Sequence, residues 1–174
     1  MIGDVAYPDL TTCGQRTEQH LVRKGMRSPQ WADVVSSFGL NEWQTQALKG
    51  LFRLKRLCEN WDGEGSLPPS TLAIDSASEL LVSLPFEDLP APFVSPTSMG
   101  GVQLEWVQNG RELEVEILPD GSMEFLTVIN GSPQEEGRIT REQVPSLARW
   151  LRDETDQRNQ TGGILGLINS LTRT

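Results

Sequence analysis

The stretch VQLEWVQNGRELEVEILPDGSMEFLTVI (102–129) decides the fold, because apolar and polar residues alternate along it in three runs. Alternation with a period of two is typical of β-strands that bury one face. Asn109-Gly110 is the preferred centre of a two-residue hairpin turn. Counting outward from this turn pairs only apolar residues on one face: Val102 with Ile117, Leu104 with Val115, and Trp106 with Leu113.

The second turn, LPDGS (118–122), is assigned by the same criterion. A two-residue Asp-Gly loop would pair Ile117 with Glu124 and place a charge among the apolar residues. A three-residue Pro-Asp-Gly loop with Gly121 in the left-handed conformation pairs Ile117 with Met123, which keeps the face apolar. We therefore predict an α+β fold with a three-stranded antiparallel β-meander packed against helices.

The opposite face of this meander is predicted to be acidic. The register places Glu105 opposite Glu114, and Glu116 opposite both Glu124 and Gln103. Like charges directly opposite each other destabilise a sheet by up to about 1 kcal/mol per pair. This face must therefore be solvated or meet cations from elsewhere, and its four glutamates are our candidate partner-binding residues.

Helices are predicted before and after the meander. In the first, near 41–60, Asn41 and Gln44 form a capping box and Asn60 ends the helix. Its apolar stripe consists of Leu48, Leu51, Leu54, Leu57, Cys58 and Trp61. A second helix begins at the cap Ser70 and stops at Pro85.

The remaining segments complete the expected order of elements. Residues 85–100 hold four prolines and are predicted to be an extended connector, and residues 131–138 a polar loop. A last helix starts with a Thr140–Gln143 capping box. Its predicted core side chains are Leu147, Trp150 and Leu151.

Three regions follow from this pass: an N-terminal extension (1–39), a core domain (40–157) and a C-terminal segment (158–174). The extension is expected to be partly helical, with a short helix at 28–39. The C-terminal segment is expected to be a flexible Gly-Gly linker followed by an apolar helix. This helix either folds back onto its own domain or docks on another protein, and the reach of the linker favours a partner or a second copy. Its candidate binding residues are Ile164, Leu165, Leu167, Ile168 and Leu171.

The loop ENWDGEGSLPP (59–69) combines turn formers with a large apolar ring. Trp61 continues the stripe of the preceding helix, so its ring is predicted to pack under the loop against the sheet. Asp62 and Gly63 then make the turn, with the Asp62 carboxylate bonded to local backbone amides. The alternative is that Trp61 is exposed as an anchor for a partner.

The net charge of the 174-residue chain is −9, and it is unevenly distributed. Residues 1–58 carry +3, residues 59–136 carry −14 with Arg111 as their one cation, and residues 137–174 carry +2. The acidic centre repels phosphate backbones, so we expect no direct nucleic-acid binding by this part of the chain. A basic protein partner is the natural complement.

Reactive groups are scarce. The one histidine is His20, and the cysteines are Cys13 and Cys58; Cys58 is expected to be a small core residue. No nucleophile, phosphate-binding or metal motif is present, so we predict no catalytic residues, no cofactor and no metal. Glu59, Asp62 and Glu64 lack the spacing of a calcium loop. A carboxylate-dependent hydrolase on the acidic face stays a minor alternative.

Residues from about 54 to 151 resemble a group of uncharacterised bacterial proteins. The resemblance rests on NWDGEGSLPPS (60–70), VSPTSMGGVQLEW (94–106) and RELEVEILPDGS (111–122). The group commonly has NWDGYGA in the loop, where this chain has Glu64 and Ser66. The resemblance implies domain limits but no activity, because the group has none established.

Together these features predict a non-enzymatic protein-binding subunit of a bacterial or phage multi-protein system, such as an antitoxin-, immunity- or defence-like regulator. The chain has no signal peptide and no apolar run of membrane-spanning length, so a reducing cytoplasm and no membrane contact are expected. A homo-oligomer is left open. The alternatives are an acidic nucleic-acid mimic and a self-assembling structural subunit.

Overall fold

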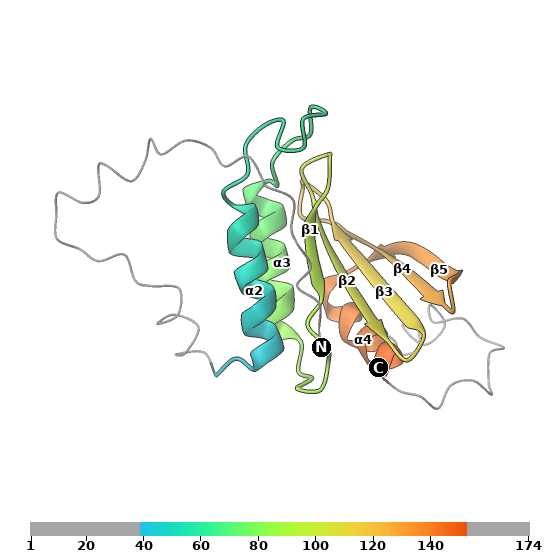
Figure 1. Cartoon of the computed structure of the whole chain (residues 1–174). Coiled ribbons are helices and arrows are strands. Elements are labelled where there is room, and N and C mark those ends of the chain that lie inside the picture. The colour runs from blue at the N-terminus through green and yellow to red at the C-terminus, as the bar shows by residue number, and fades with distance from the viewer. Residues whose placement is uncertain (1–38, 153–174) are drawn as a thin grey trace, which may run out of the picture.

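The computed structural model describes residues 39–152. In this range, five antiparallel strands form one sheet in the order β1-β2-β3-β4-β5, and helices cover one of its faces (Figure 1). The helical elements are α2 (Glu42–Leu54), α3 (Thr71–Ser83), the 3-10 turn η3 (Arg141–Gln143) and α4 (Val144–Arg152). The strands are β1 (Phe93–Pro96), β2 (Val102–Gln108), β3 (Arg111–Ile117), β4 (Met123–Ile129) and β5 (Ser132–Ile139). The predicted helix at 28–39 lies almost wholly outside the described residues, and the C-terminal segment entirely so.

The α+β class is confirmed, and so is the predicted register of β2 with β3 and of β3 with β4. Trp106 pairs with Leu113, and Ile117 pairs with both Val102 and Met123. Asn109 and Gly110 have φ values of 53° and 74°, as the two central residues of a type I′ turn require. Gly121 has φ 83° and closes the three-residue loop.

The prediction of three strands is wrong, because the sheet has two further strands at its edges. Residues 131–138, predicted to be a polar loop, lie mostly in β5, which pairs with β4 after a tight turn at Asn130-Gly131 with φ values of 49° and 77°. The predicted connector contains β1, which pairs with β2. Edge strands need no apolar alternation, and they tolerate proline such as Pro96 and Pro133.

Helix α2 begins as predicted and ends early. The Asn41 side chain accepts a hydrogen bond from the Gln44 backbone N–H at 3.0 Å, and the Asn41 N–H donates to Gln44 Oε1 at 3.1 Å. The helix ends at Leu54, although Leu57 is still buried. Asn60 is left-handed, with φ 62°, but it lies in the following loop and does not end the helix.

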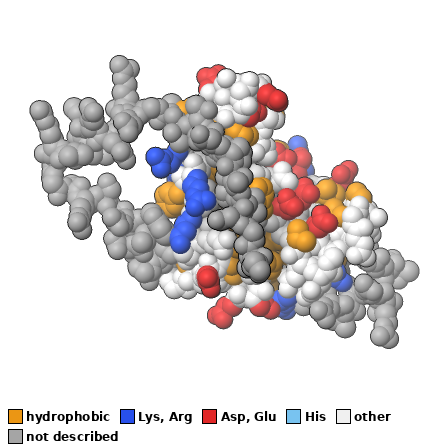
Figure 2. Space-filling view, in the orientation of Figure 1, with side chains coloured by type: hydrophobic (Ala, Val, Ile, Leu, Met, Phe, Trp, Pro, Cys, Tyr) orange, Lys and Arg blue, Asp and Glu red, His pale blue; other side chains and the backbone are white. Residues whose placement is uncertain are grey.

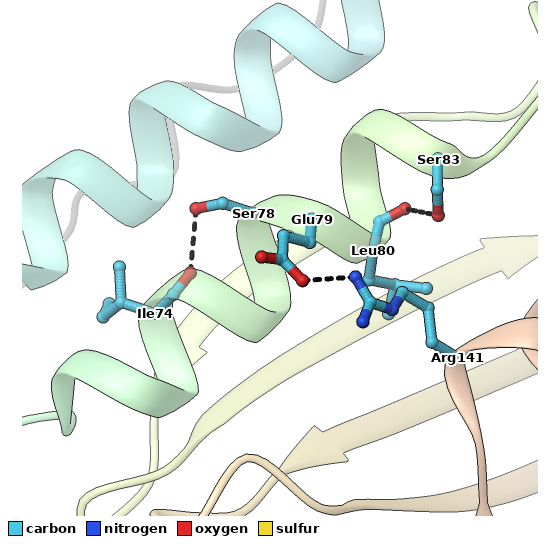
Figure 3. Close-up of polar contacts among 6 residues, drawn as sticks. All are labelled: Ile74, Ser78, Glu79, Leu80, Ser83 and Arg141. Carbon is cyan, nitrogen blue, oxygen red and sulfur yellow. Dashed lines mark hydrogen bonds and ion pairs between the residues drawn. The ribbon is translucent and has the colours of Figure 1, made fainter.

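Helix α3 is capped by Ser70, whose hydroxyl accepts from the Ala73 N–H at 2.9 Å. Within the helix, Ser78 and Ser83 donate to the backbone carbonyls of Ile74 and Leu80, each at 2.8 Å (Figure 3). The same view shows Arg141 of η3 forming an ion pair with Glu79. This pair joins two elements that lie far apart in the sequence.

All three α-helices and the inward faces of the strands share one apolar core. Helix α2 packs beside α3 and β1, while α4 lies against β2 and β3 (Figure 1). The predicted core residues Leu147, Trp150 and Leu151 are buried. Gln44 is also buried and donates to the Leu81 carbonyl at 2.9 Å, so this polar side chain fastens α2 to α3.

The turn between β1 and β2 leaves no room for a side chain at Gly101. A Cβ there would lie 2.7 Å from both the Ile117 carbonyl oxygen and Thr97 Oγ1. We expect Gly101→Ala to lower the free energy of unfolding by about 1–3 kcal/mol, measured by denaturant titration. The control is Gly137→Ala in β5, whose Cβ would meet Phe125 at an ordinary 3.7 Å. Equal losses in both variants would contradict the close approach at Gly101.

Candidate functional site

The face of the sheet turned away from the helices is the main candidate. No described helix packs on it, and on β2 and β3 its side chains are more exposed than their neighbours along each strand. We call this surface the outer face. Its members from β2 to β5 include Gln103, Glu105, Glu112, Glu114, Glu116, Glu124, Leu126, Glu136 and Arg138.

The ladder brings the four predicted glutamates together. Glu105 is the direct partner of Glu114, and Glu116 is the direct partner of Gln103 on one side and Glu124 on the other. Gln103 Nε2 donates to Glu114 Oε2 at 3.1 Å, which satisfies one carboxylate oxygen. Negative charge is therefore concentrated over three adjacent strands.

Strand β5, which was not predicted from the sequence, forms one side of the outer face. Arg138 lies opposite Glu124, with its Nε 3.5 Å from Glu124 Oε1, and Glu136 lies opposite Leu126. Arg138 is 82% exposed, so this ion pair is weak in water. The dipeptide Asn130-Gly131 was the signal for this strand, because it repeats the turn chemistry of Asn109-Gly110.

A shallow open groove of about 440 Å³ runs across the outer face. Its lining is made of Gln103, Glu114, Glu116, Glu124, Phe125, Leu126, Glu136, Gly137 and Arg138. Figure 2 shows acidic and hydrophobic side chains next to each other over the strands. A groove with carboxylate walls and an apolar patch at Leu126 suits a long cationic side chain, which has an apolar stem and a charged head.

Glu114 sits at the centre of this charge. Partial burial raises its pKa above the usual value, and the nearby charges of Glu105 and Glu112 raise it further. Both effects disfavour the ionised form, whereas a cation placed near Glu114 would favour it by offsetting the repulsion from Glu105 and Glu112. The groove is open to solvent, whereas acid–base catalysis by paired carboxylates favours a partly dry pocket.

The loop 59–70 is held together by Asp62. Its Oδ1 accepts from the Glu64 N–H at 2.9 Å and from the Ser66 N–H at 3.3 Å, and its Oδ2 accepts from the Ser66 hydroxyl. Gly63 is left-handed, with φ 81°. Trp61 is half-buried against the core, and its Nε1 donates to the Leu67 carbonyl at 3.1 Å. The indole ring therefore links the start of the loop to Leu67.

This loop is fastened to two turns of the sheet. The Leu67 N–H donates to the Ser98 carbonyl at 2.9 Å, and the Ser70 N–H donates to the Gly100 carbonyl at 2.9 Å. The Ser70 hydroxyl donates to the Pro119 carbonyl at 2.7 Å. Loop 59–70, turn 97–101 and turn 118–122 thus form one surface, which we call the loop end.

The remaining candidate residues either lie away from the outer face or fall outside the described residues. Arg111, the one cation of the acidic centre, is buried, donates to the Trp150 carbonyl and lies 5.2 Å from the centre of the Trp150 ring, so it fastens α4 to the sheet. Cys58 was predicted to be a small core residue, but it is only half-buried and lies outside the apolar core. The candidates His20 and Ile164, Leu165, Leu167, Ile168 and Leu171 lie outside the described residues.

Within residues 39–152, no three His, Cys, Asp or Glu side chains are grouped so that they could hold a metal ion. No helix in this range is both long enough and apolar enough to cross a membrane. Comparison with known proteins gives no match to a family model, a curated protein or a solved structure. The outer face and the loop end must therefore be interpreted from their own chemistry.

The first prediction from this site concerns Glu114 and stability. Because its pKa is raised in the folded state, the fold loses stability as pH rises through the range between the unfolded and folded pKa values. At pH 7, Glu114→Gln should raise the free energy of unfolding by a few tenths to about 1 kcal/mol. The gain should vanish below about pH 4, where the carboxyl is protonated in both states.

Urea unfolding at both pH values tests this expectation, with Glu59→Gln as the control. Glu59 is exposed in the loop and lies away from the outer face. A gain of equal size in both variants would show that only total charge matters.

The second prediction concerns Asp62, whose pKa is lowered chiefly by the hydrogen bond from the Ser66 hydroxyl and next by the Glu64 backbone N–H. We expect Ser66→Ala to raise the pKa of Asp62 toward its ordinary value, as followed by NMR titration of the carboxyl carbon. The matched control is Ser122→Ala, because Ser122 lowers the pKa of Asp120 in the same way. Each substitution should move only its own partner, and a pKa of Asp62 unchanged by Ser66→Ala would refute the assignment.

Proposed function

We propose that this chain is a non-enzymatic protein-binding subunit that holds a basic partner on its outer face. The observation that carries the proposal is the sheet face that no described helix covers, which carries six glutamates, four of them lining one groove. These are Glu105, Glu112, Glu114, Glu116, Glu124 and Glu136, and the exposed Arg138 is the one cation among the outer-face residues defined above.

The physical reason is electrostatic. Carboxylates that face each other across a ladder repel, and water only partly screens them. Lysine or arginine side chains of a partner would replace this repulsion with attraction, and their apolar stems would cover Leu126. A partner with a basic patch therefore gains both orientation and association rate from this face.

The biological setting is a further part of the proposal. The resemblance to a group of bacterial proteins favours a bacterial or phage multi-protein system, in which this chain acts as an antitoxin-, immunity- or defence-like regulator in the cytoplasm. The apolar residues 164–171 supply a second contact, either to the partner or to another copy of the chain.

A nucleic-acid mimic is the second candidate, favoured by the regular row of charge on β3. Glu112, Glu114 and Glu116 alternate along one strand and so project from the same face about 6.8 Å apart. Such a row could compete for a protein that binds phosphate backbones. A steep loss of affinity with salt, together with competition by DNA or RNA, would distinguish this function.

The test of the main proposal is a paired charge reversal. After the binding protein is captured from a lysate of the native host and identified, its affinity is measured for wild type, for Glu105→Lys/Glu114→Lys, and for Glu59→Lys/Glu87→Lys. The first double variant should weaken binding by about tenfold or more, because two contacts become repulsive. The second has the same net charge but alters exposed residues outside the outer face, so it should bind nearly as wild type.

Thermal melting of each variant shows whether the fold survives. Unchanged affinity of the first double variant would remove the outer face from the mechanism. Equal weakening of both double variants would reduce the effect to net charge alone.

A further inference from the structure

Three large apolar side chains are exposed at the loop end: Leu67 in the loop, Met99 in turn 97–101, and Leu72 beside them in the first turn of α3. Leu67 is 45% exposed, Leu72 is 60% exposed and Met99 is 70% exposed. Leu67 and Met99 are bridged through their backbones. Backbone hydrogen bonds already hold the loop and the turn that carry these two residues. Exposing their apolar side chains therefore adds nothing to the stability of the fold. Exposed apolar clusters of this kind mark interaction surfaces.

The three side chains belong to one continuous surface. A Cβ on Gly100 would lie 3.5 Å from Leu67 Cβ and 3.9 Å from Pro119 Cγ. A Cβ on Gly121, two residues beyond Pro119, would lie 3.9 Å from Leu72 Cβ. The turn at 118–122 therefore fills the space between Leu67 and Leu72.

This apolar surface has an acidic border. The loop and two turns carry Glu59, Asp62, Glu64 and Asp120, and no Lys, Arg or His occurs in them. Acidic side chains are visible on the loop at the top of Figure 2. An occupant of this surface should therefore be apolar, should carry positive charge and should lack carboxylate side chains.

Within the chain itself, residues 158–174 meet this description. Their sequence RNQTGGILGLINSLTRT contains no Asp or Glu, carries Arg158 and Arg173, and gathers five branched apolar residues between 164 and 171. We propose that the loop end binds the C-terminal segment, residues 164–174, of a second copy of this chain. Apolar side chains of the segment cover Leu67, Leu72 and Met99, and Arg173 meets the acidic border.

The position of α4 favours a second copy over the same copy. Arg111 follows the β2–β3 turn directly and donates a hydrogen bond to the Trp150 carbonyl of α4. Helix α4 therefore ends where the strands meet the β2–β3 turn, which is the end of the sheet opposite the loop end. A seven-residue strand spans about 23 Å. Residues 153–163, behaving as a random coil, would have an average end-to-end distance of about 18 Å. Docking within one copy therefore needs the linker to extend beyond its average length, which favours a second copy.

The surface is distinct from the outer face, so the inference does not depend on the partner proposed above. The full chain is studied by light scattering over a range of concentrations, with the expectation of a reversible dimer. Met99→Glu on the loop end and Leu167→Glu in the C-terminal segment should each weaken the dimer by about tenfold or more. The control is Val107→Glu, which alters another exposed apolar residue (57%) away from the loop end and should leave the dimer unchanged.

Mixing the two defective variants gives the sharper result. The Met99→Glu copy keeps its C-terminal segment and the Leu167→Glu copy keeps its loop end, so the mixture should form a heterodimer that neither variant forms alone. A charge exchange adds a second readout: Glu64→Arg and Arg173→Glu should each weaken the dimer, and the double variant should recover part of the loss.

Thermal melting of every variant tests whether the substitution leaves the fold intact. Three outcomes would overturn the inference. These are a wild-type chain that is monomeric at all concentrations, a dimer that Met99→Glu does not weaken, and a mixture of the two defective variants that stays monomeric. The first would be the result if the segment docked within its own copy.

Discussion

The left-handed turn at Asn109-Gly110 is the constraint on which the rest of the molecule depends. It fixes the register of β2 against β3, and a slip by one residue would send every side chain of a strand to the opposite face. With the observed register, Trp106 and Leu113 lie in the core and Glu105 and Glu114 lie outside. The same turn therefore determines both the apolar surface for the helices and the acidic outer face.

Because the apolar core and the acidic outer face lie on opposite sides of the sheet, the fold tolerates the repulsion between the glutamates. This repulsion still lowers the stability of the fold. The apolar faces of three helices and five strands meet in one core, which supplies the stability of the fold. On the other side, Glu114 receives one hydrogen bond from Gln103 and is repelled by its neighbours. A merely solvated face would be more stable with glutamines in place of these glutamates, so the concentration of charge on this face favours a basic partner.

The meander and the mutual positions of its glutamates could be predicted from the sequence because apolar alternation and turn chemistry act over neighbouring residues. The edge strands could not, because their pairing depends on backbone hydrogen bonds to β2 and β4. The segments that contain Ser95 in β1 and Gln134 in β5 do not alternate regularly between apolar and polar residues. For the same reason the acidic face was predicted without the residues of β5, although Asn130-Gly131 carried a usable turn signal. Helix α2 ends earlier than predicted because tight turns follow Leu54. These turns still bury Leu57.

The loop end illustrates how local hydrogen bonds can release apolar side chains for binding. Most exposed loops are anchored by burying their apolar residues, and here Trp61 alone has that role in the segment 59–66. Asp62 satisfies the backbone of the loop, and Ser70 bonds the turns beside it. Because those bonds hold the shape, Leu67 and Met99 can project into solvent without loosening the turns. A surface that is both ordered in advance and apolar loses little conformational freedom when it is covered, which is the condition that favours tight association.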